Sequence, residues 1–126
     1  MPGRRAPLAV LAASLVLLCG CGQTLRVGSD HTLNVALTEY RVAPQRIHAP
    51  AGLLTIVVHN YGRLAHNLVI SRGGQTEAAT QPISPGETAE LAVTLGPGTY
   101  LVASTILSDQ ALGAYGTLTV RQEPSG

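Results

Sequence analysis

The stretch that decides the fold is Thr99–Val120, TYLVASTILSDQALGAYGTLTV. Residues 100–105 and 116–121, at its two ends, are rich in β-branched and large apolar side chains, which suit a pleated, half-buried surface. Between these ends, Asp109 and Gly113 are residue types that favour a loop. The stretch therefore predicts a strand, a loop and a closing strand, and the loop is where functional side chains are expected.

The rest of the chain shows the pattern of further short strands. Apolar and polar residues alternate in 32–38 and 87–95, which is the period of a half-buried strand. Residues 53–60, LLTIVVHN, form a nearly continuous apolar run, which predicts a strand covered on both faces. Shorter strands are expected at 46–49 and 66–71, separated by turns rich in Gly and Pro. About seven or eight strands without a helical period predict an all-β fold, an antiparallel Greek-key β-sandwich.

The segment Leu95-Gly96-Pro97-Gly98-Thr99-Tyr100 has the pattern of a tyrosine corner. In such a corner, the tyrosine hydroxyl bonds to the backbone a few residues upstream. We therefore predict a structural role for Tyr100 and no catalytic one.

The N-terminus has the pattern of an export signal. Two arginines, at positions 4 and 5, precede the apolar run 8–19, which is too short to span a bilayer. The run leads into Leu-Cys-Gly-Cys, residues 18–21, which resembles a bacterial lipobox. Cys21 is the expected lipid attachment site, because the small residue Gly20 precedes it. An uncleaved anchor, ordinary cleavage and a pairing of the two cysteines are less favoured alternatives.

These features divide the chain of 126 residues into four parts. Residues 1–20 are the predicted signal peptide, 21–31 a lipidated N-terminus with a polar tether, 32–121 the folded domain and 122–126 a tail. A composition of 45% hydrophobic and 12% charged residues suits one globular domain. Removal of the signal takes two of the eight arginines and leaves six against seven carboxylates, a balance that does not attract nucleic acid.

A series of short motifs runs through nearly the whole mature chain. They are Thr38-Glu39-Tyr40, Pro44, Ala51-Gly52, Asn60-Tyr61-Gly62 with His66 close behind, Pro85-Gly86, Pro97-Gly98-Thr99-Tyr100 and Gly116-Thr117-Leu118-Thr119-Val120. Their order resembles that of the cupredoxins, the blue-copper fold, and most of all the small cupredoxin-like domains of exported bacterial proteins. The resemblance places the family's first histidine ligand on His66. It places the family's cysteine, second histidine and methionine ligands on Ser104, Asp109 and Ala114.

Blue-copper chemistry needs two imidazoles and a thiolate, usually with a weak axial thioether, because soft sulfur keeps both copper oxidation states accessible. The predicted domain has no sulfur: the two cysteines are residues 19 and 21, and the sole methionine is Met1. The sequence therefore predicts no type 1 copper site. His66 is expected to hydrogen-bond to loop backbone, and the alternative is that His66 and Asp109 form a hard-donor site for zinc or copper.

If the cupredoxin geometry is kept, His66, Ser104 and Asp109 converge at one end of the sandwich. These are the residue types of a nucleophilic triad, but residues 103–105 lack the flanking glycines of a nucleophile elbow, and we predict no enzyme activity. A buried polar plug, in which Ser104 and Asp109 bond to each other, is the simpler interpretation. The remaining histidines, at positions 31, 48 and 59, are expected to face solvent.

The sequence thus predicts an exported, lipid-anchored, cupredoxin-like protein that acts as a non-catalytic binding module at the bacterial cell envelope. Its expected partners are the membrane, through a lipid on Cys21, and an envelope protein, and no cofactor is predicted. The alternative function is a metal-handling or electron-transfer cupredoxin that holds copper or another metal through His66 and Asp109.

Overall fold

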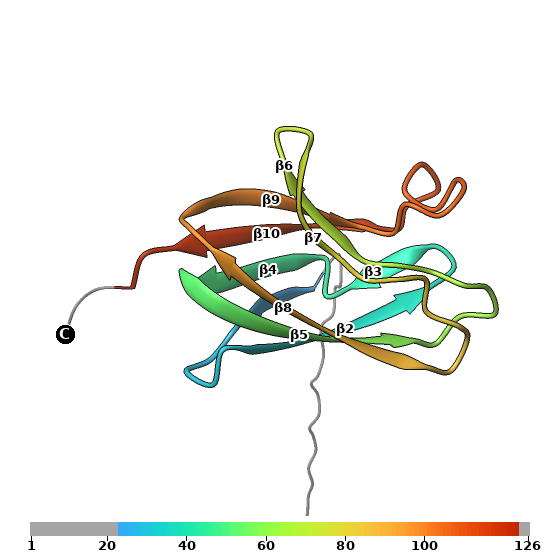
Figure 1. Ribbon diagram of the computed structural model, residues 1–126, viewed down its shortest axis with the longest axis horizontal. Coiled ribbons are helices and arrows are strands. Elements are labelled where there is room, and N and C mark those ends of the chain that lie inside the picture. The colour runs from blue at the N-terminus through green and yellow to red at the C-terminus, as the bar shows by residue number, and fades with distance from the viewer. Residues whose placement is uncertain (1–22, 124–126) are drawn as a thin grey trace, which may run out of the picture.

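The computed structural model describes residues 23–123, which form two packed sheets (Figure 1). One sheet has six strands in the order β1-β4-β10-β9-β6-β7, and the other has four in the order β3-β2-β5-β8. The strands are β1 (Thr24–Arg26), β2 (Thr32–Thr38), β3 (Arg41–Ala43), β4 (Arg46–Pro50), β5 (Gly52–Asn60), β6 (Val69–Arg72), β7 (Gln75–Ala79), β8 (Thr88–Leu95), β9 (Gly98–Ala103) and β10 (Tyr115–Arg121). The predicted all-β sandwich is confirmed.

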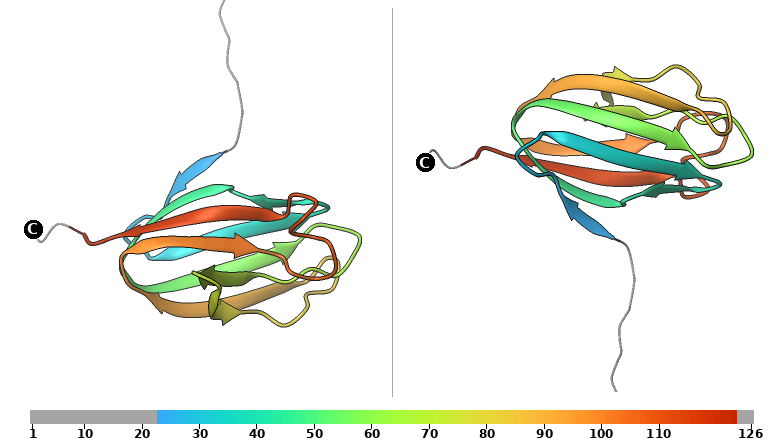
Figure 2. Two further views of the ribbon diagram at one scale, coloured as in Figure 1. Left: turned by 90° about the horizontal axis from the view of Figure 1, so that it is seen from above. Right: turned by 90° about the horizontal axis from the view of Figure 1, so that it is seen from below.

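The core fills the space between the two layers, which Figure 2 shows from above and below. In β2 the side chains of Leu33, Val35 and Leu37 are at most 2% exposed, as the alternating pattern predicts. In β5 the inward residues Leu54, Ile56 and Val58 are equally buried, whereas Leu53 is 58% exposed. The prediction that both faces of β5 are largely covered holds only in part: the other outward residues, 55, 57 and 59, are half-buried, because this sheet has the core on one side only.

Three strand pairs are parallel: β1 with β4, β4 with β10, and β2 with β5. The other pairs are antiparallel, so the sheets are mixed, and the expectation of wholly antiparallel pairing does not hold. The chain passes from β2 through β3 to β4 in the opposite sheet before it returns in β5, and this crossover makes β2 and β5 parallel. Residue alternation specifies the buried face of a strand but not its direction, which is why the sequence did not reveal this.

Two of the ten strands, β1 and β7, were not expected. β1 has three residues and β7 is polar, so neither carries a hydrophobic period. The strand expected at 66–71 begins later, at Val69, and His66 makes only an isolated bridge with Ile83. The segment 23–31, expected to be a tether, contains β1, whose residues pair in register with Arg46–His48 of β4. Backbone hydrogen bonds hold it there while its side chains stay exposed, and a sequence pattern does not reveal such pairing.

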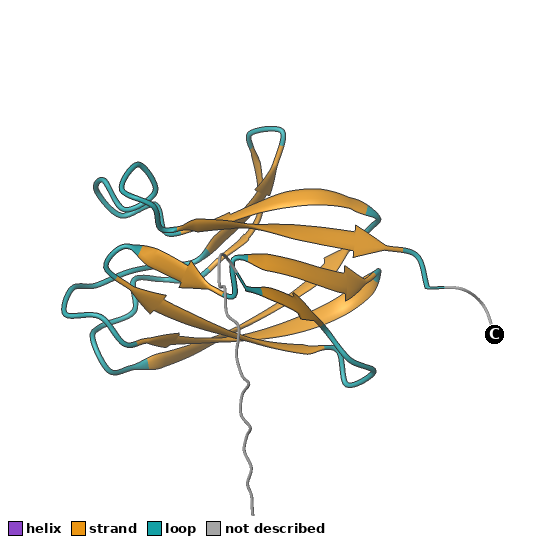
Figure 3. Ribbon diagram, turned by 180° about the vertical axis from the view of Figure 1, so that it is seen from behind, coloured by secondary structure: helices purple, strands orange, loops and turns teal. Residues whose placement is uncertain are grey.

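Two ends of the sandwich differ in construction. At one end Tyr100, which is 2% exposed, donates its hydroxyl hydrogen to Gly96 O over 2.7 Å, and the predicted tyrosine corner is confirmed. At the other end the loops that follow β2, β5 and β9 gather, which Figure 3 shows as a cluster of irregular chain. We call this the loop end. No helix occurs in residues 23–123, so this part of the chain has no helix able to cross a membrane.

Candidate functional site

His66 lies fully buried in the loop between β5 and β6. Its backbone N donates to Ile83 O over 3.2 Å, and Ile83 N donates to His66 O over 2.7 Å. Asn60, which ends β5, braces this bridge: its Nδ2 donates to Leu64 O and Ile83 O, each over 2.8 Å, and its Oδ1 accepts from Gly62 N. The loop is therefore held on both sides of the imidazole, and the ring has a fixed position.

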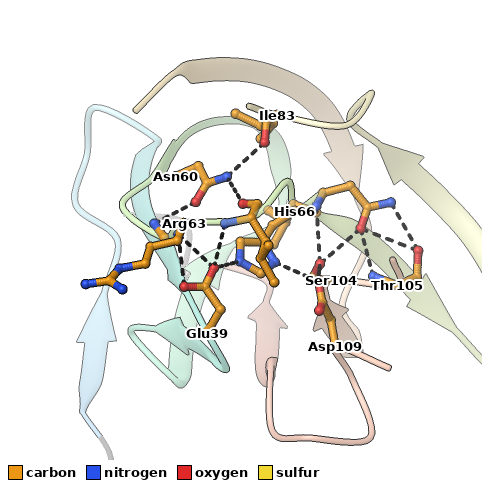
Figure 4. A network of polar contacts seen from close by, with 12 residues as sticks. Glu39, Asn60, Arg63, His66, Ile83, Ser104, Thr105 and Asp109 are labelled. Atoms are coloured by element: carbon orange, nitrogen blue, oxygen red, sulfur yellow. Dashed lines mark hydrogen bonds and ion pairs between the residues drawn. The ribbon is translucent and has the colours of Figure 1, made fainter. Parts of the chain in front are cut away.

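Both ring nitrogens of His66 contact a carboxylate (Figure 4). Nδ1 lies 2.6 Å from Asp109 Oδ2, and Nε2 lies 2.5 Å from Glu39 Oε2. An ionised carboxylate only accepts hydrogen bonds, so with two ionised carboxylates both nitrogens donate, and the ring is an imidazolium. One cation thus lies between two anions and joins the three loops of the loop end.

Glu39 follows β2 and is held by the backbone of the β5–β6 loop. Arg63 N donates to Oε1 and Oε2 over 2.9 and 3.0 Å, and Leu64 N donates to Oε2 over 3.1 Å. The bond from Arg63 N and that from His66 lower the pKa of Glu39 to about 2. A Cβ at position 62 would collide with this carboxylate, so Gly62 allows the loop backbone to wrap around it.

Burial and hydrogen bonding act in opposite directions on His66. Burial alone lowers the pKa of an imidazole because it disfavours the charged form. The hydrogen bonds to Asp109 and Glu39, with the attraction of their charges, outweigh burial and raise the pKa of His66 above its usual value of 6.5. This direction agrees with the imidazolium that the two contacts require.

Ser104 completes the network from the end of β9. Its Oγ donates to Asp109 Oδ2 over 2.6 Å and accepts from Asn67 N over 3.2 Å. Asn67 in turn accepts from Thr105 N over 2.7 Å, which ties the β5–β6 loop to the β9–β10 loop. The order of contacts is Ser104–Asp109–His66, so the carboxylate lies between hydroxyl and imidazole. This order gives the serine no general base of the kind a nucleophilic triad needs.

The expected convergence of His66, Ser104 and Asp109 is confirmed, and Ala114 lies with them, because Ser104 N donates to Ala114 O over 3.0 Å. Ser104 and Asp109 form the buried polar pair that the sequence suggested. Glu39 was not predicted as part of the site, although it lies in one of the quoted motifs, because a charged residue at a strand end is ordinarily exposed. The predicted lipid attachment site, Cys21, lies outside the described residues.

The sequence matches the family described as "Cupredoxin-like domain" over residues 8–120. The chain belongs to this cupredoxin-like family. No curated protein sequence is significantly similar to it.

Solved structures agree with the cupredoxin-like fold. A reduced auracyanin from the photosynthetic bacterium Roseiflexus castenholzii is 24% identical, with a TM-score of 0.69 over 75% of this chain and 99% of that one. Auracyanin B is 20% identical, with a TM-score of 0.67 over 82% of this chain and 93% of that one. An azurin from Methylomonas sp. strain J is 14% identical, with a TM-score of 0.64 over 72% and 98%.

The residues of this cupredoxin-like domain do not fit a type 1 copper ion. Ser104 has a hydroxyl where the resemblance places a thiolate, and the side chain of Ala114 has no donor atom. His66 uses both nitrogens as hydrogen-bond donors, so no lone pair faces Ser104 and Asp109. Within residues 23–123 no group of three or more His, Cys, Asp or Glu side chains is arranged to hold a metal ion.

The other three histidines are half-buried rather than fully solvent-facing. His59 lies at the end of β5, where its Nδ1 is 2.5 Å from Thr88 Oγ1 and its ring is tilted against Tyr61 with centroids 4.1 Å apart. His31 and His48 lie before β2 and within β4. Each of the three is separate from the His66 network.

Proposed function

We propose that this chain is an exported, lipid-anchored member of the cupredoxin-like family that has no electron-transfer role and acts as a non-catalytic binding module at the cell envelope. The single observation that carries the proposal is the pair of carboxylates on His66. They make His66, the one cupredoxin ligand position that still carries a histidine, a protonated link between loops. This link holds the loops together, as a metal ion would.

The lipid anchor is supported by the arginines, the apolar run and the lipobox-like residues 18–21. We expect Cys21→Ala to leave an unprocessed precursor or to release the domain, because the bilayer attachment comes from acyl chains and not from the short apolar run. Detergent-phase partitioning and the mass of the mature N-terminus measure this. Unchanged processing and partitioning in the variant would contradict the anchor.

A binding role is supported by exposed apolar side chains at the loop end. Tyr61 and Leu64 are 67% and 52% exposed in the β5–β6 loop, and Leu107 and Leu112 are 96% and 57% exposed in the β9–β10 loop. The His66 network ties these two loops together, so the four side chains are presented on a preorganised surface. Such a surface suits a protein partner, because rigid apolar anchors lose little entropy on binding.

Copper loading of the purified protein tests the absence of electron-transfer chemistry. We expect no intense blue absorption and no reversible copper couple, because no thiolate is available for charge transfer. The competing metal-handling function predicts Cu(II) or Zn(II) binding that His66→Ala abolishes and that acid releases as the imidazole protonates. Calorimetric titration of the protein and of His66→Ala distinguishes the two functions. Binding that His66→Ala abolishes, or a strong visible band in the unmodified protein, would overturn the proposal.

The combined variant Ser104→Cys, Asp109→His and Ala114→Met tests whether the fold keeps the geometry of a copper site. Removal of Asp109 frees Nδ1 of His66, while Glu39 still accepts from Nε2 and fixes the ring tautomer. We expect copper loading to give a visible band in this variant and none in a control that keeps Asp109 and changes only Ser104 and Ala114. A colourless triple variant that remains folded would mean that the loop end has lost the geometry as well as the ligands.

A further inference from the structure

The side of the domain that carries β1 and β3 is cationic. We define the N-terminal edge as five exposed residues on this side: Leu25, Arg26, Tyr40, Arg41 and Arg46. The edge is continuous, because Thr24 of β1 pairs with Arg46 of β4, and Gln23, Tyr40 and Arg41 line one hollow. Within residues 23–123 no carboxylate lies within ion-pair distance of its three arginines.

Charge is distributed unevenly between the two sides of the sandwich. The N-terminal edge has three arginines, against Asp30 in the hollow beside Leu25 and Arg26 and Glu123 in a second hollow that Arg26 shares with Arg121. On the opposite side, Glu77 in β7 and the exposed Glu87 and Glu90 in and beside β8 form an acidic edge. β1 and β7 are the two outer strands of the same sheet, so positive and negative charge lie at its opposite borders.

The predicted anchor adds a distance limit. Cys21 is two residues from Gln23, the first described residue, and two residues span at most about 7 Å. Gln23 lies beside Tyr40 and Arg41 in the hollow they share. A lipid on Cys21 therefore keeps Gln23, and with it the adjoining part of the N-terminal edge, close to the bilayer surface.

We propose that the N-terminal edge lies flat on an anionic phospholipid surface, the same bilayer that holds the lipid on Cys21; this inference rests on the proposed lipid anchor. Arg26, Arg41 and Arg46 contact the phosphate groups, and Tyr40, which is 39% exposed, enters the headgroup region. Tyrosine suits that depth because its ring is apolar and its hydroxyl is polar.

The proposed orientation has a consequence for the rest of the domain. The acidic edge formed by Glu77, Glu87 and Glu90 points away from the anionic surface, where like charges would otherwise repel. The β5–β6 and β9–β10 loops, with their exposed Tyr61 and Leu107, stay open to an envelope partner at the side of the docked domain. Lipid and partner would thus use different surfaces of one small module.

A fluorescence-quenching experiment on the full-length lipoprotein tests the orientation. Gln45→Cys places a thiol beside the N-terminal edge, and Gln75→Cys places one on β7; both glutamines are exposed and neither is a proposed contact. Each introduced thiol is labelled with bimane, and the label reacts with this thiol alone because the lipid occupies the sulfur of Cys21. The protein is then reconstituted into phosphatidylglycerol vesicles that carry a headgroup nitroxide. We expect several-fold stronger quenching at position 45 than at position 75.

Charge variants test the cause of the orientation. The triple variant Arg26→Gln, Arg41→Gln and Arg46→Gln should remove most of the difference in quenching, as should phosphatidylcholine vesicles or 1 M salt. Among single variants, Arg41→Gln should lower the ratio of docked to undocked protein roughly fivefold, the effect of about 1 kcal/mol per arginine at an anionic surface. Arg72→Gln removes the same charge from the exposed end of β6, next to β7 at the opposite border of the sheet, and should leave the ratio unchanged.

Vesicle flotation separates the two possible failures. Protein that floats with the vesicles but shows equal quenching at positions 45 and 75 would overturn the docked orientation and leave the lipid anchor standing. Protein that does not float, with an unmodified N-terminus by mass spectrometry, would overturn both. Equal effects of Arg41→Gln and Arg72→Gln would also overturn the proposed contacts.

Discussion

The two ends of β9 show two ways of burying polar groups in the same sandwich. At its start, the neutral hydroxyl of Tyr100 needs a single partner, Gly96 O, and finds it four residues upstream. At its end, Ser104 belongs to a network of charged groups that spans three loops. The first arrangement is local and follows from a short motif. The second depends on residues far apart in the sequence, and each of them requires the others, because an unpaired buried charge is costly.

This difference predicts unequal sensitivity to substitution. Removal of Asp109, which is 5% exposed, would leave Nδ1 of His66 without its acceptor and would leave Ser104 with only the longer contact of 3.3 Å to Asn67 Oδ1. We expect Asp109→Ala to lower the free energy of unfolding by about 3–5 kcal/mol, the cost of breaking a buried charge pair. Urea unfolding measures the loss. Asp109→Asn is the matched control and should cost less, because it keeps an oxygen that can accept one of the two bonds.

The apolar core between the two ends provides the next prediction. Ile56 is fully buried in the middle of β5, so Ile56→Ala should cost about 2–5 kcal/mol through lost burial and the cavity left behind. Leu91 in β8 is only partly buried against this core, and Leu91→Ala should cost less than Ile56→Ala. Glu90→Ala on the exposed face should stay near about 0.5 kcal/mol. Equal losses on both faces of β8 would contradict the sandwich.

More of the fold than of the candidate site could be predicted from the sequence. Alternation in 32–38 and 88–95 reports burial directly, because side chains on a strand point to opposite faces in turn. The chain shares its order of motifs with the cupredoxins, and this order pointed to His66, Ser104 and Asp109. Glu39 was missed, because its role depends on donors at Arg63 and Leu64 that only the folded loop brings to it. β1 was missed because backbone pairing with β4, and not a pattern of buried side chains, holds it in the sheet.

The charged network also predicts a pH dependence that the tyrosine corner does not have. Glu39 keeps its charge in the folded protein down to about pH 2, so its contribution is present above its usual pKa of 4.5 and is lost as the pH falls toward 2. The pKa of His66 is raised in the folded protein, so its contribution is present below 6.5 and is lost as the pH rises through the folded value. These two groups therefore favour a stability maximum between pH 4.5 and 6.5.

Thermal unfolding across pH measures this profile, and two variants assign its limbs. His66→Gln should flatten the alkaline limb, and Glu39→Gln should weaken the acidic limb, to which the other carboxylates also contribute. Tyr100→Phe should leave the shape of the profile unchanged. An alkaline limb that survives in His66→Gln would mean that another group causes it, and that the imidazolium link does not stabilise the loop end.

The smallest effect is expected at the tyrosine corner itself. Tyr100→Phe removes the hydroxyl and leaves Gly96 O, which is near the surface and can bond to water, so the loss should be about 0.5–1.5 kcal/mol. The ring stays buried and continues to lie under the Arg72 guanidinium, whose Cζ is 4.8 Å from the ring centroid. Tyr115→Phe is the control, because Tyr115 is 45% exposed and should lose almost nothing. If Tyr100→Phe lowered the free energy of unfolding as much as Asp109→Ala does, the two ends of β9 would be equally sensitive to substitution. That result would contradict the contrast between a single neutral hydrogen bond and a linked set of charges.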